Sequence, residues 1–155
     1  MKLKEVKYED LSKIKYKIYV SEHEEFREPE FLVIKFSGTY RYGNKGAPDA
    51  RFMLGTIRGA IGAWHSMSII LDLSKLKYDW GDEMNDVIDI GFGLSTECEF
   101  PLVVVVSEKC RDGLKKLLRT DYDTYCREDL EQAYTLGREK IHDYMACQEA
   151  SRGET

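Results

Sequence analysis

The chain has 155 residues and a formal charge of −5, with 43% hydrophobic and 33% charged residues. This length suits a single α/β domain over residues 1–155, and the composition is that of a folded protein. The acidic balance argues against a nucleic-acid partner, because binding to phosphates depends on clustered Lys and Arg. It favours a basic protein partner instead.

The N-terminus and the cysteines indicate a cytoplasmic protein. No apolar run follows Met1-Lys2-Leu3-Lys4-Glu5, so we expect no secretory signal. No stretch approaches the roughly 20 apolar residues that a membrane span needs. The four cysteines, Cys98, Cys110, Cys126 and Cys147, show no Cys-x-x-Cys spacing. We therefore expect free thiols and no bound metal.

Two strands joined by an acidic loop open the chain. Residues 14–20 alternate apolar and polar side chains, which is the period of a strand with one face on a core. Residues 31–36 form a second apolar run, and the segment between them, residues 22–30, is rich in glutamate. This pattern predicts an antiparallel hairpin.

The first long helix follows an irregular segment at residues 39–48. Pro48 and Asp49 suit a helix start, because proline is tolerated in the first turn. At 100° per residue one sector of this helix is apolar and should face the core. Its members are Met53, Ile57, Ala60, Ile61 and Trp64.

The remaining elements alternate strands and helices. Short apolar runs at 68–73 and 101–106 predict buried strands, and a helix is expected from near Asp82. Helical spacing marks a helix around Leu114 and a final helix that begins near Leu130, with a short strand at 122–126 between them. The tail after Cys147 should be frayed. The order β-β-α-β-α-β-α-β-α predicts an α/β fold with a mixed, mostly parallel sheet, whose antiparallel member is the first strand.

The sequence offers no catalytic or cofactor motif. None of His23, His65 and His142 has a neighbouring nucleophile in the sequence. The loop from Gly43 to Gly46 lacks a phosphate-binding glycine pattern. We therefore expect a protein that is not an enzyme and needs no cofactor.

The element order and several segments resemble the STAS domain, the fold of bacterial anti-sigma-factor antagonists. The most specific segments are residues 69–74 and 77–82, which look like that family's strand and the loop that opens its second helix. Residues 100–106, 110–118 and 129–141 are similar to its last strands and helices. The resemblance implies a regulator that binds a partner protein. In that family a Ser or Thr beside the loop aspartate is phosphorylated, whereas Trp80 and Gly81 stand here next to Asp79.

Partner contact is expected on the loops at the carboxyl ends of adjacent strands, where open α/β sheets place their binding crevices. The residues assigned to it are Tyr40, Tyr42, Tyr78, Asp79, Trp80, Gly81 and Asp82. The acidic loop is a second candidate, in which Glu22, Glu24, Glu25 and Glu28 would steer a basic partner. Two alternatives stay open: Trp80 belongs to the core, and the acidic loop is only a connection.

Two other functions remain open at this point. Small acidic proteins without catalytic motifs also include immunity or antitoxin-like inhibitors that neutralise a basic toxin such as a nuclease. A fainter resemblance, over residues 69–84 and 101–118, is to the crotonase core that binds acyl-CoA. That enzyme function needs paired small residues at an oxyanion hole, whereas Gly81 and Gly113 are isolated.

Overall fold

The computed structural model describes residues 1–22, 28–94 and 97–153. The first half contains η1 (Tyr8–Asp10), β1 (Lys15–Val20), β2 (Phe31–Thr39), η2 (Gly43–Gly46), α1 (Ala47–Trp64) and β3 (Ser68–Lys77). The second half contains α2 (Met84–Ile88), α3 (Ile90–Leu94), β4 (Leu102–Val105), α4 (Arg111–Leu118), η3 (Arg119–Asp121), α5 (Tyr122–Tyr125), β5 (Cys126–Arg127) and α6 (Leu130–Gly153). The predicted alternation of strands and helices is confirmed.

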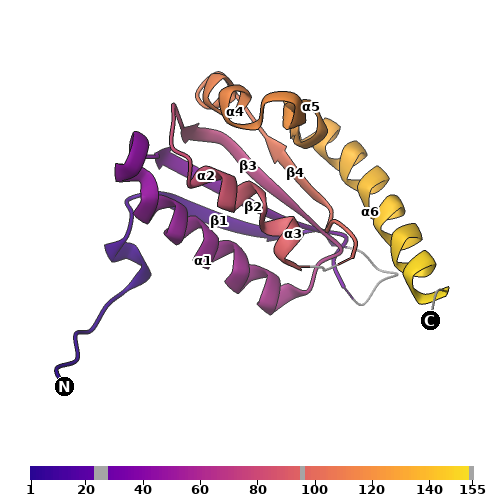
Figure 1. The fold of residues 1–155 in the computed structure, drawn as a ribbon, viewed down its shortest axis with the longest axis horizontal. Helices are drawn as coiled ribbons and strands as arrows, with labels where there is room; N and C mark the ends of the chain where they lie inside the picture. The colour runs from indigo at the N-terminus through magenta and orange to yellow at the C-terminus, as the bar shows by residue number, and fades with distance from the viewer. Residues whose placement is uncertain (23–27, 95–96, 154–155) are drawn as a thin grey trace.

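The five strands form one sheet in the order β1-β2-β3-β4-β5. β1 pairs with β2 in the antiparallel sense, and all other neighbours are parallel. The mixed, mostly parallel sheet and its antiparallel first strand therefore agree with the sequence prediction. The helices of the parallel crossovers lie on one side of the sheet, and α6, which follows β5, covers the other side (Figure 1).

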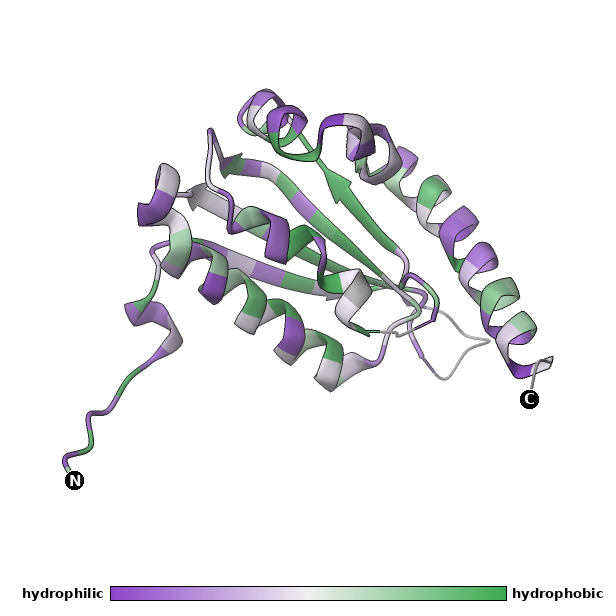
Figure 2. Cartoon of the chain, viewed as in Figure 1, coloured by the Kyte–Doolittle hydropathy of each residue, from purple (hydrophilic) through white to green (hydrophobic). Residues whose placement is uncertain are grey.

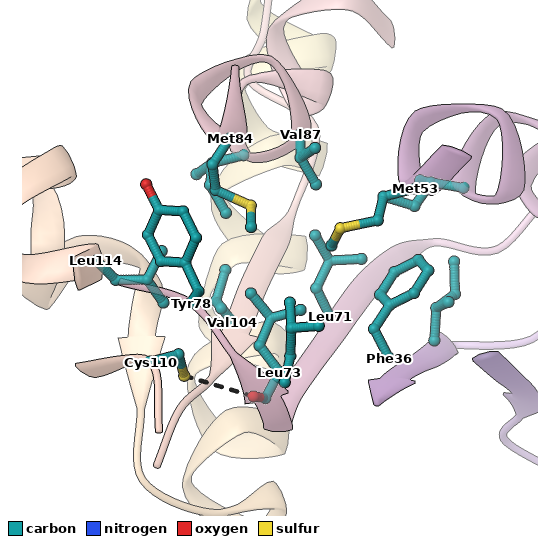
Figure 3. Close-up of a cluster of buried hydrophobic side chains, with 14 of the residues drawn as sticks. Phe36, Met53, Leu71, Leu73, Tyr78, Met84, Val87, Val104, Cys110 and Leu114 are labelled. Carbon is teal, nitrogen blue, oxygen red and sulfur yellow. Dashed lines mark hydrogen bonds between the residues drawn. The ribbon is translucent and has the colours of Figure 1, made fainter. Parts of the chain in front are cut away.

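The larger core lies on the side of the sheet that carries α1, α2 and α3. Side chains from all five strands meet there, and the long apolar runs of β3 and β4 are coloured green in Figure 2. Met53 and Ile57 of α1 are fully buried in this cluster, as the sequence periodicity predicted. Figure 3 shows Met53 near Leu71 and Phe36. Trp64 departs from that prediction, because its side chain is 44% exposed at the end of the helix.

α6 covers the opposite side of the sheet, over β3, β4 and β5. Phe31, Ile70 and Val103 form the buried patch beneath it, together with Ala133 and Ile141 from the helix. Gly137 lets the helix approach closely, since an added Cβ would lie 2.6 Å from the Phe31 ring. The expected frayed tail is wrong, because α6 continues past Cys147 to Gly153.

Three further expectations need correction. The segment after Asp82 forms two short helices, α2 and α3, instead of one long one. Residues 122–125 form a helical turn, and the last strand is limited to β5. The expectation of four free thiols is wrong as well, because Cys98 and Cys147 form a disulfide with Cα atoms 6.0 Å apart. The fold brings the end of α6 past the loop before β4 and so joins two residues 49 positions apart.

The helices carry no membrane signal. Within residues 1–22, 28–94 and 97–153, no helix is long and apolar enough to cross a bilayer.

Candidate functional site

Three loops meet at the carboxyl ends of β2, β3 and β4. The Tyr40 N–H donates to the Lys77 carbonyl at 2.9 Å, and the Gly43 N–H donates to the Trp80 carbonyl at 2.9 Å. The Tyr78 N–H donates to the Lys109 carbonyl at 3.1 Å. These bonds tie the loop after each strand to its neighbour, so the exposed side chains of this region stand on an ordered backbone.

Tyr40 and Tyr78 form the buried base of this region, which corrects their prediction as contact residues. Their exposed fractions are 3% and 1%, and their rings meet edge to face with centroids 5.2 Å apart. Figure 3 shows Tyr78 within the apolar cluster, near Leu114 and Met84. Residues this buried cannot touch a partner, so their role here is to support the loops.

The two hydroxyl groups have different surroundings. The Tyr78 hydroxyl donates to the Gly81 carbonyl at 3.0 Å. The Tyr40 hydroxyl and one carboxylate oxygen of Glu83 are buried with no hydrogen-bond partner among the described residues. Burial raises the pKa of both phenols, and the charge of Glu83 raises that of Tyr40 further. Both tyrosines are therefore neutral at physiological pH.

Two glycines allow the loops to pack this closely. A Cβ at Gly81 would lie 2.8 Å from the Tyr40 ring, and a Cβ at Gly113 would lie 2.7 Å from the Tyr78 carbonyl oxygen. Both distances are shorter than real Cβ contacts allow. Gly81 is itself buried, so this predicted contact residue shapes the loop and offers no surface.

The exposed part of the site lies on this base. Tyr42 is 68% exposed, Trp80 is half-buried, and Asp79 and Asp82 are exposed. A cleft of ≈ 390 Å³ opens between Trp80 and the start of α4. Its lining residues are Tyr42, Tyr78, Asp79, Trp80, Glu108, Lys109, Asp112, Gly113 and Lys116. Sequence reasoning missed the contribution of α4, because only the tertiary fold places that helix beside the loop after β3.

The acidic loop lies at the other end of the sheet. Glu22 and Glu28 are exposed beside the end of β1 and the start of β2, while Glu24 and Glu25 lie outside the described residues. The nine residues of β2 separate this loop from Tyr42 and Trp80 by roughly 25–30 Å at about 3.3 Å per residue. The structure therefore does not bring the two predicted contact regions together.

A buried carboxylate that the sequence did not single out as functional anchors the loop before α1. Asp49 is 1% exposed and accepts hydrogen bonds from the Ser12 hydroxyl, the Arg41 backbone N–H and the Arg41 guanidinium. Burial alone would raise its pKa, but these hydrogen bonds and the Arg41 charge together lower it below the usual value. Asp49 joins the N-terminal segment to the site loops.

The described residues contain no group of three or more His, Cys, Asp or Glu side chains arranged to hold a metal ion. The chemistry of the carboxyl-end loops is that of exposed aromatic rings, carboxylates and lysines on a fixed backbone.

Comparison with known proteins identifies the fold. No protein-family model and no curated protein sequence matches the chain. A crystal structure of an anti-sigma factor antagonist from Mycobacterium paratuberculosis matches 80% of this chain and 95% of its own, with a TM-score of 0.50 and 21% identity. This likeness concerns the fold. It confirms the STAS-like architecture that the sequence segments indicated.

Proposed function

We propose that this chain is a non-enzymatic regulator that acts by binding another protein. The contact region is the carboxyl-end surface, which we define as Tyr42, Asp79, Trp80 and Asp82. The fold shared with an anti-sigma factor antagonist supports a regulatory role of this kind. The cytoplasmic location expected from the sequence loses the support of four free thiols, because Cys98 and Cys147 form a disulfide.

One observation carries the proposal: two aromatic side chains are exposed on a backbone that the core holds in place. Tyr42 and Trp80 are linked through the hydrogen bond from Gly43 to the Trp80 carbonyl, and the buried Tyr40 lies beneath them. Large aromatic side chains on rigid supports are the residues that most often dominate protein interfaces, because they bury apolar area with little loss of conformational freedom.

The charges around this surface favour a basic partner. Asp79 and Asp82 are exposed, and Asp86 follows in the first turn of α2. Carboxylates at the rim of an interface attract a basic partner and mainly raise the association rate.

We further propose that the phosphorylation switch of the STAS family is absent from this loop. The two residues that follow Asp79 are Trp80 and Gly81, which carry no hydroxyl group. Gly81 also packs against Tyr40, where an added Cβ would lie 2.8 Å from the ring. A Ser or Thr at this position would need a rearranged loop.

The acyl-CoA alternative has little support in the geometry. That chemistry needs two N–H groups aimed at one substrate oxygen. Gly113 lies in the first turn of α4 against the carbonyls of Tyr78 and Asp79, and Gly81 packs against Tyr40. These close contacts explain why both positions are glycine, without an oxyanion hole. The immunity-like alternative shares the same surface chemistry and differs only in the partner that is identified.

In the test, wild type and Trp80→Ala are each immobilised as bait. Each protein that the wild type retains is then purified, and its affinity for both forms is measured. Because Trp80 is half-buried, we expect a loss of about 1 kcal/mol in folding stability. We expect a larger loss, about 2 kcal/mol or more, in affinity for the true partner. Calorimetry measures both quantities.

Met145→Ala is the matched control, since Met145 is 49% exposed on α6, away from the carboxyl-end surface. It should keep the same partner. Equal affinity of wild type and Trp80→Ala for every retained protein would remove the carboxyl-end surface from the proposal. A retained anti-sigma factor or kinase supports the regulator, whereas a retained nuclease supports the immunity-like alternative.

A further inference from the structure

The edge of the sheet formed by β1 has a free side. β1 is the first strand in the sheet order and pairs only with β2. No strand in the described part of the chain lies along its other side. An edge strand presents unpaired backbone N–H and C=O groups, which are a template for one more strand.

The two faces of β1 differ in chemistry. Tyr16 and Ile18 face α1, and the Tyr16 ring lies 6.0 Å from the Phe52 ring between centroids. Lys15 and Lys17 therefore point to the opposite face, because side chains alternate along a strand. This is the face of α6, but α6 covers β3 to β5 and leaves these lysines exposed.

These two lysines have no counter-ion among the described residues. Lys17 lies directly opposite Lys35 in the sheet register, and such a pair of like charges is unfavourable. Lys35 has its own partners, since its amino group lies 3.7 Å from the Asp72 carboxylate and over the Tyr19 ring. The positive charge of Lys15 and Lys17 is thus unbalanced at the edge.

An apolar groove runs beside the same edge on the α1 face. Its volume is ≈ 220 Å³, and Tyr8, Tyr16, Phe52 and Trp64 contribute to its walls. Tyr16 and Trp64 are 45% and 44% exposed. Gly59 of α1 also lines the groove, and a Cβ there would meet nothing within 4 Å. The groove is open to side chains from outside.

We infer that the β1 edge binds an extended segment of another protein in which acidic and apolar side chains alternate. Such a segment adds a sixth strand and forms main-chain hydrogen bonds with β1. Its acidic side chains lie beside Lys15 and Lys17, and its apolar side chains enter the groove beside Trp64. This surface is separate from the carboxyl-end surface and needs a partner of opposite charge.

A second copy of this chain does not fit the edge equally well. Pairing of β1 with another β1 would bring the lysines of both copies onto one face, where like charges repel. The first 20 residues of each copy carry six lysines and only three carboxylates, which adds to the repulsion. The charge therefore blocks self-association and selects an acidic strand.

The direct test is titration with a blocked eight-residue peptide of alternating glutamate and valine at low ionic strength, followed by NMR. We expect shifts and slowed hydrogen exchange at the β1 amides. A peptide of the same composition with glutamates and valines in separate blocks should bind at least about tenfold more weakly, because it cannot place charge on one face only.

The charge-reversed variant Lys15→Glu/Lys17→Glu tests the recognition itself. Both side chains are exposed, so the fold should persist, and circular dichroism checks this. We expect roughly tenfold weaker binding of the glutamate–valine peptide and new binding of a lysine–valine peptide, since two cross-strand contacts change sign. Trp64→Ala should weaken binding of the glutamate–valine peptide severalfold, because it removes part of the groove wall.

The matched control is Lys115→Glu/Arg119→Glu, which makes the same change of charge at two exposed positions on α4 and η3. Its affinity for the glutamate–valine peptide should lie within about twofold of the wild-type affinity, because salt screens the long-range effect of the changed charges. The inference would be overturned by equal affinity for both glutamate peptides, by the absence of binding at β1, or by binding of an oligothymidine at Lys15 and Lys17 in place of the peptide. Self-association of the reversed variant without peptide binding by wild type would show that the lysines only prevent edge pairing.

Discussion

The two faces of the sheet are buried in different ways. On the α1 side, one apolar cluster extends from Ile14 near the sheet edge to Cys126 in the last strand, and several helices close it. On the α6 side, the described residues form a smaller cluster, covered by one helix, that begins at Phe31 and reaches only β2, β3 and β4. Beyond that cover stand Lys15, Lys17 and Lys35.

In the proposals made above, stability and recognition belong to different parts of the molecule. The continuous core fixes the positions of Tyr40 and Tyr78, and through them the exposed loop with Trp80. The incomplete cover of the other face leaves the polar side of β1 in solvent. Both proposed contact regions lie where the apolar cover ends, as expected if burial supplies stability and its boundary supplies the binding surface.

The largest expected effect is a difference between core truncations on the two faces. Leu71→Ala removes a fully buried side chain from the α1 side, and Ile141→Ala removes an α6 side chain that is 8% exposed and packs on the opposite face of the sheet. We expect losses of about 4 and about 2 kcal/mol in the free energy of unfolding, because a rigid core surrounded on all sides cannot collapse around the cavity. Urea unfolding measures both. Equal losses would show that α6 is packed as tightly as α1.

The disulfide should stabilise only the α6 side of the sheet. Buried contacts of α6 end at Ile141, and the later turns are held by the Tyr144–Phe100 ring contact and the Cys98–Cys147 bond. Cys98→Ser/Cys147→Ser should cost about 2–4 kcal/mol. It should also speed hydrogen exchange over residues 142–153.

A reductant provides the control for this experiment. It should reproduce the effect in wild type and leave the double-serine variant unchanged. Burial raises the pKa of the Cys110 thiol to about 11 and that of Cys126 to about 12, so neither thiol is a good nucleophile near neutral pH. Unchanged exchange after reduction would mean that packing alone holds the end of α6.

The smallest effect concerns the polar anchor on the α1 side. Asp49→Asn should cost about 2 kcal/mol at neutral pH, because it replaces charge-assisted hydrogen bonds to Ser12 and Arg41 with weaker ones. The pKa of Asp49 is lowered in the folded state. Its contribution is therefore present above its unfolded pKa of about 3.9 and is lost as pH falls through the folded value. The stability gap between wild type and Asp49→Asn should shrink in acid. A gap independent of pH would show that the charge is not involved.

Strands and helices could be predicted because their patterns are local. The alternation at residues 14–20 and the unbroken apolar runs at 68–73 and 101–106 each reflect how one strand meets a core. The resemblance of residues 69–82 to STAS segments then indicated the arrangement, which the fold confirms. Periodicity was less useful at helix ends, where Trp64 follows the apolar spacing of α1 but is 44% exposed beside the edge strand β1.

The structure brings the predicted contact residues of the carboxyl-end loops together but divides them between exposed and buried positions. Tyr40, Tyr42, Tyr78 and Trp80 are all aromatic residues near glycines in irregular segments, so local sequence does not distinguish them. The fold buries Tyr40 and Tyr78 against each other and leaves Tyr42 exposed. That outcome depends on α4 and α2, which reach these loops from other parts of the chain.

The sequence by itself determined the strand and helix order, the parallel sheet and the likeness to a STAS fold, because hydrophobic periodicity and short motifs are set by neighbours along the chain. Only the tertiary structure decided that Cys98 meets Cys147, that Asp49 anchors Ser12 and Arg41, and that Lys15 and Lys17 lie on the edge strand with no counter-ion among the described residues. Each of these depends on distances between residues far apart in sequence. Those distances are fixed by the packing of the whole core and by no local pattern.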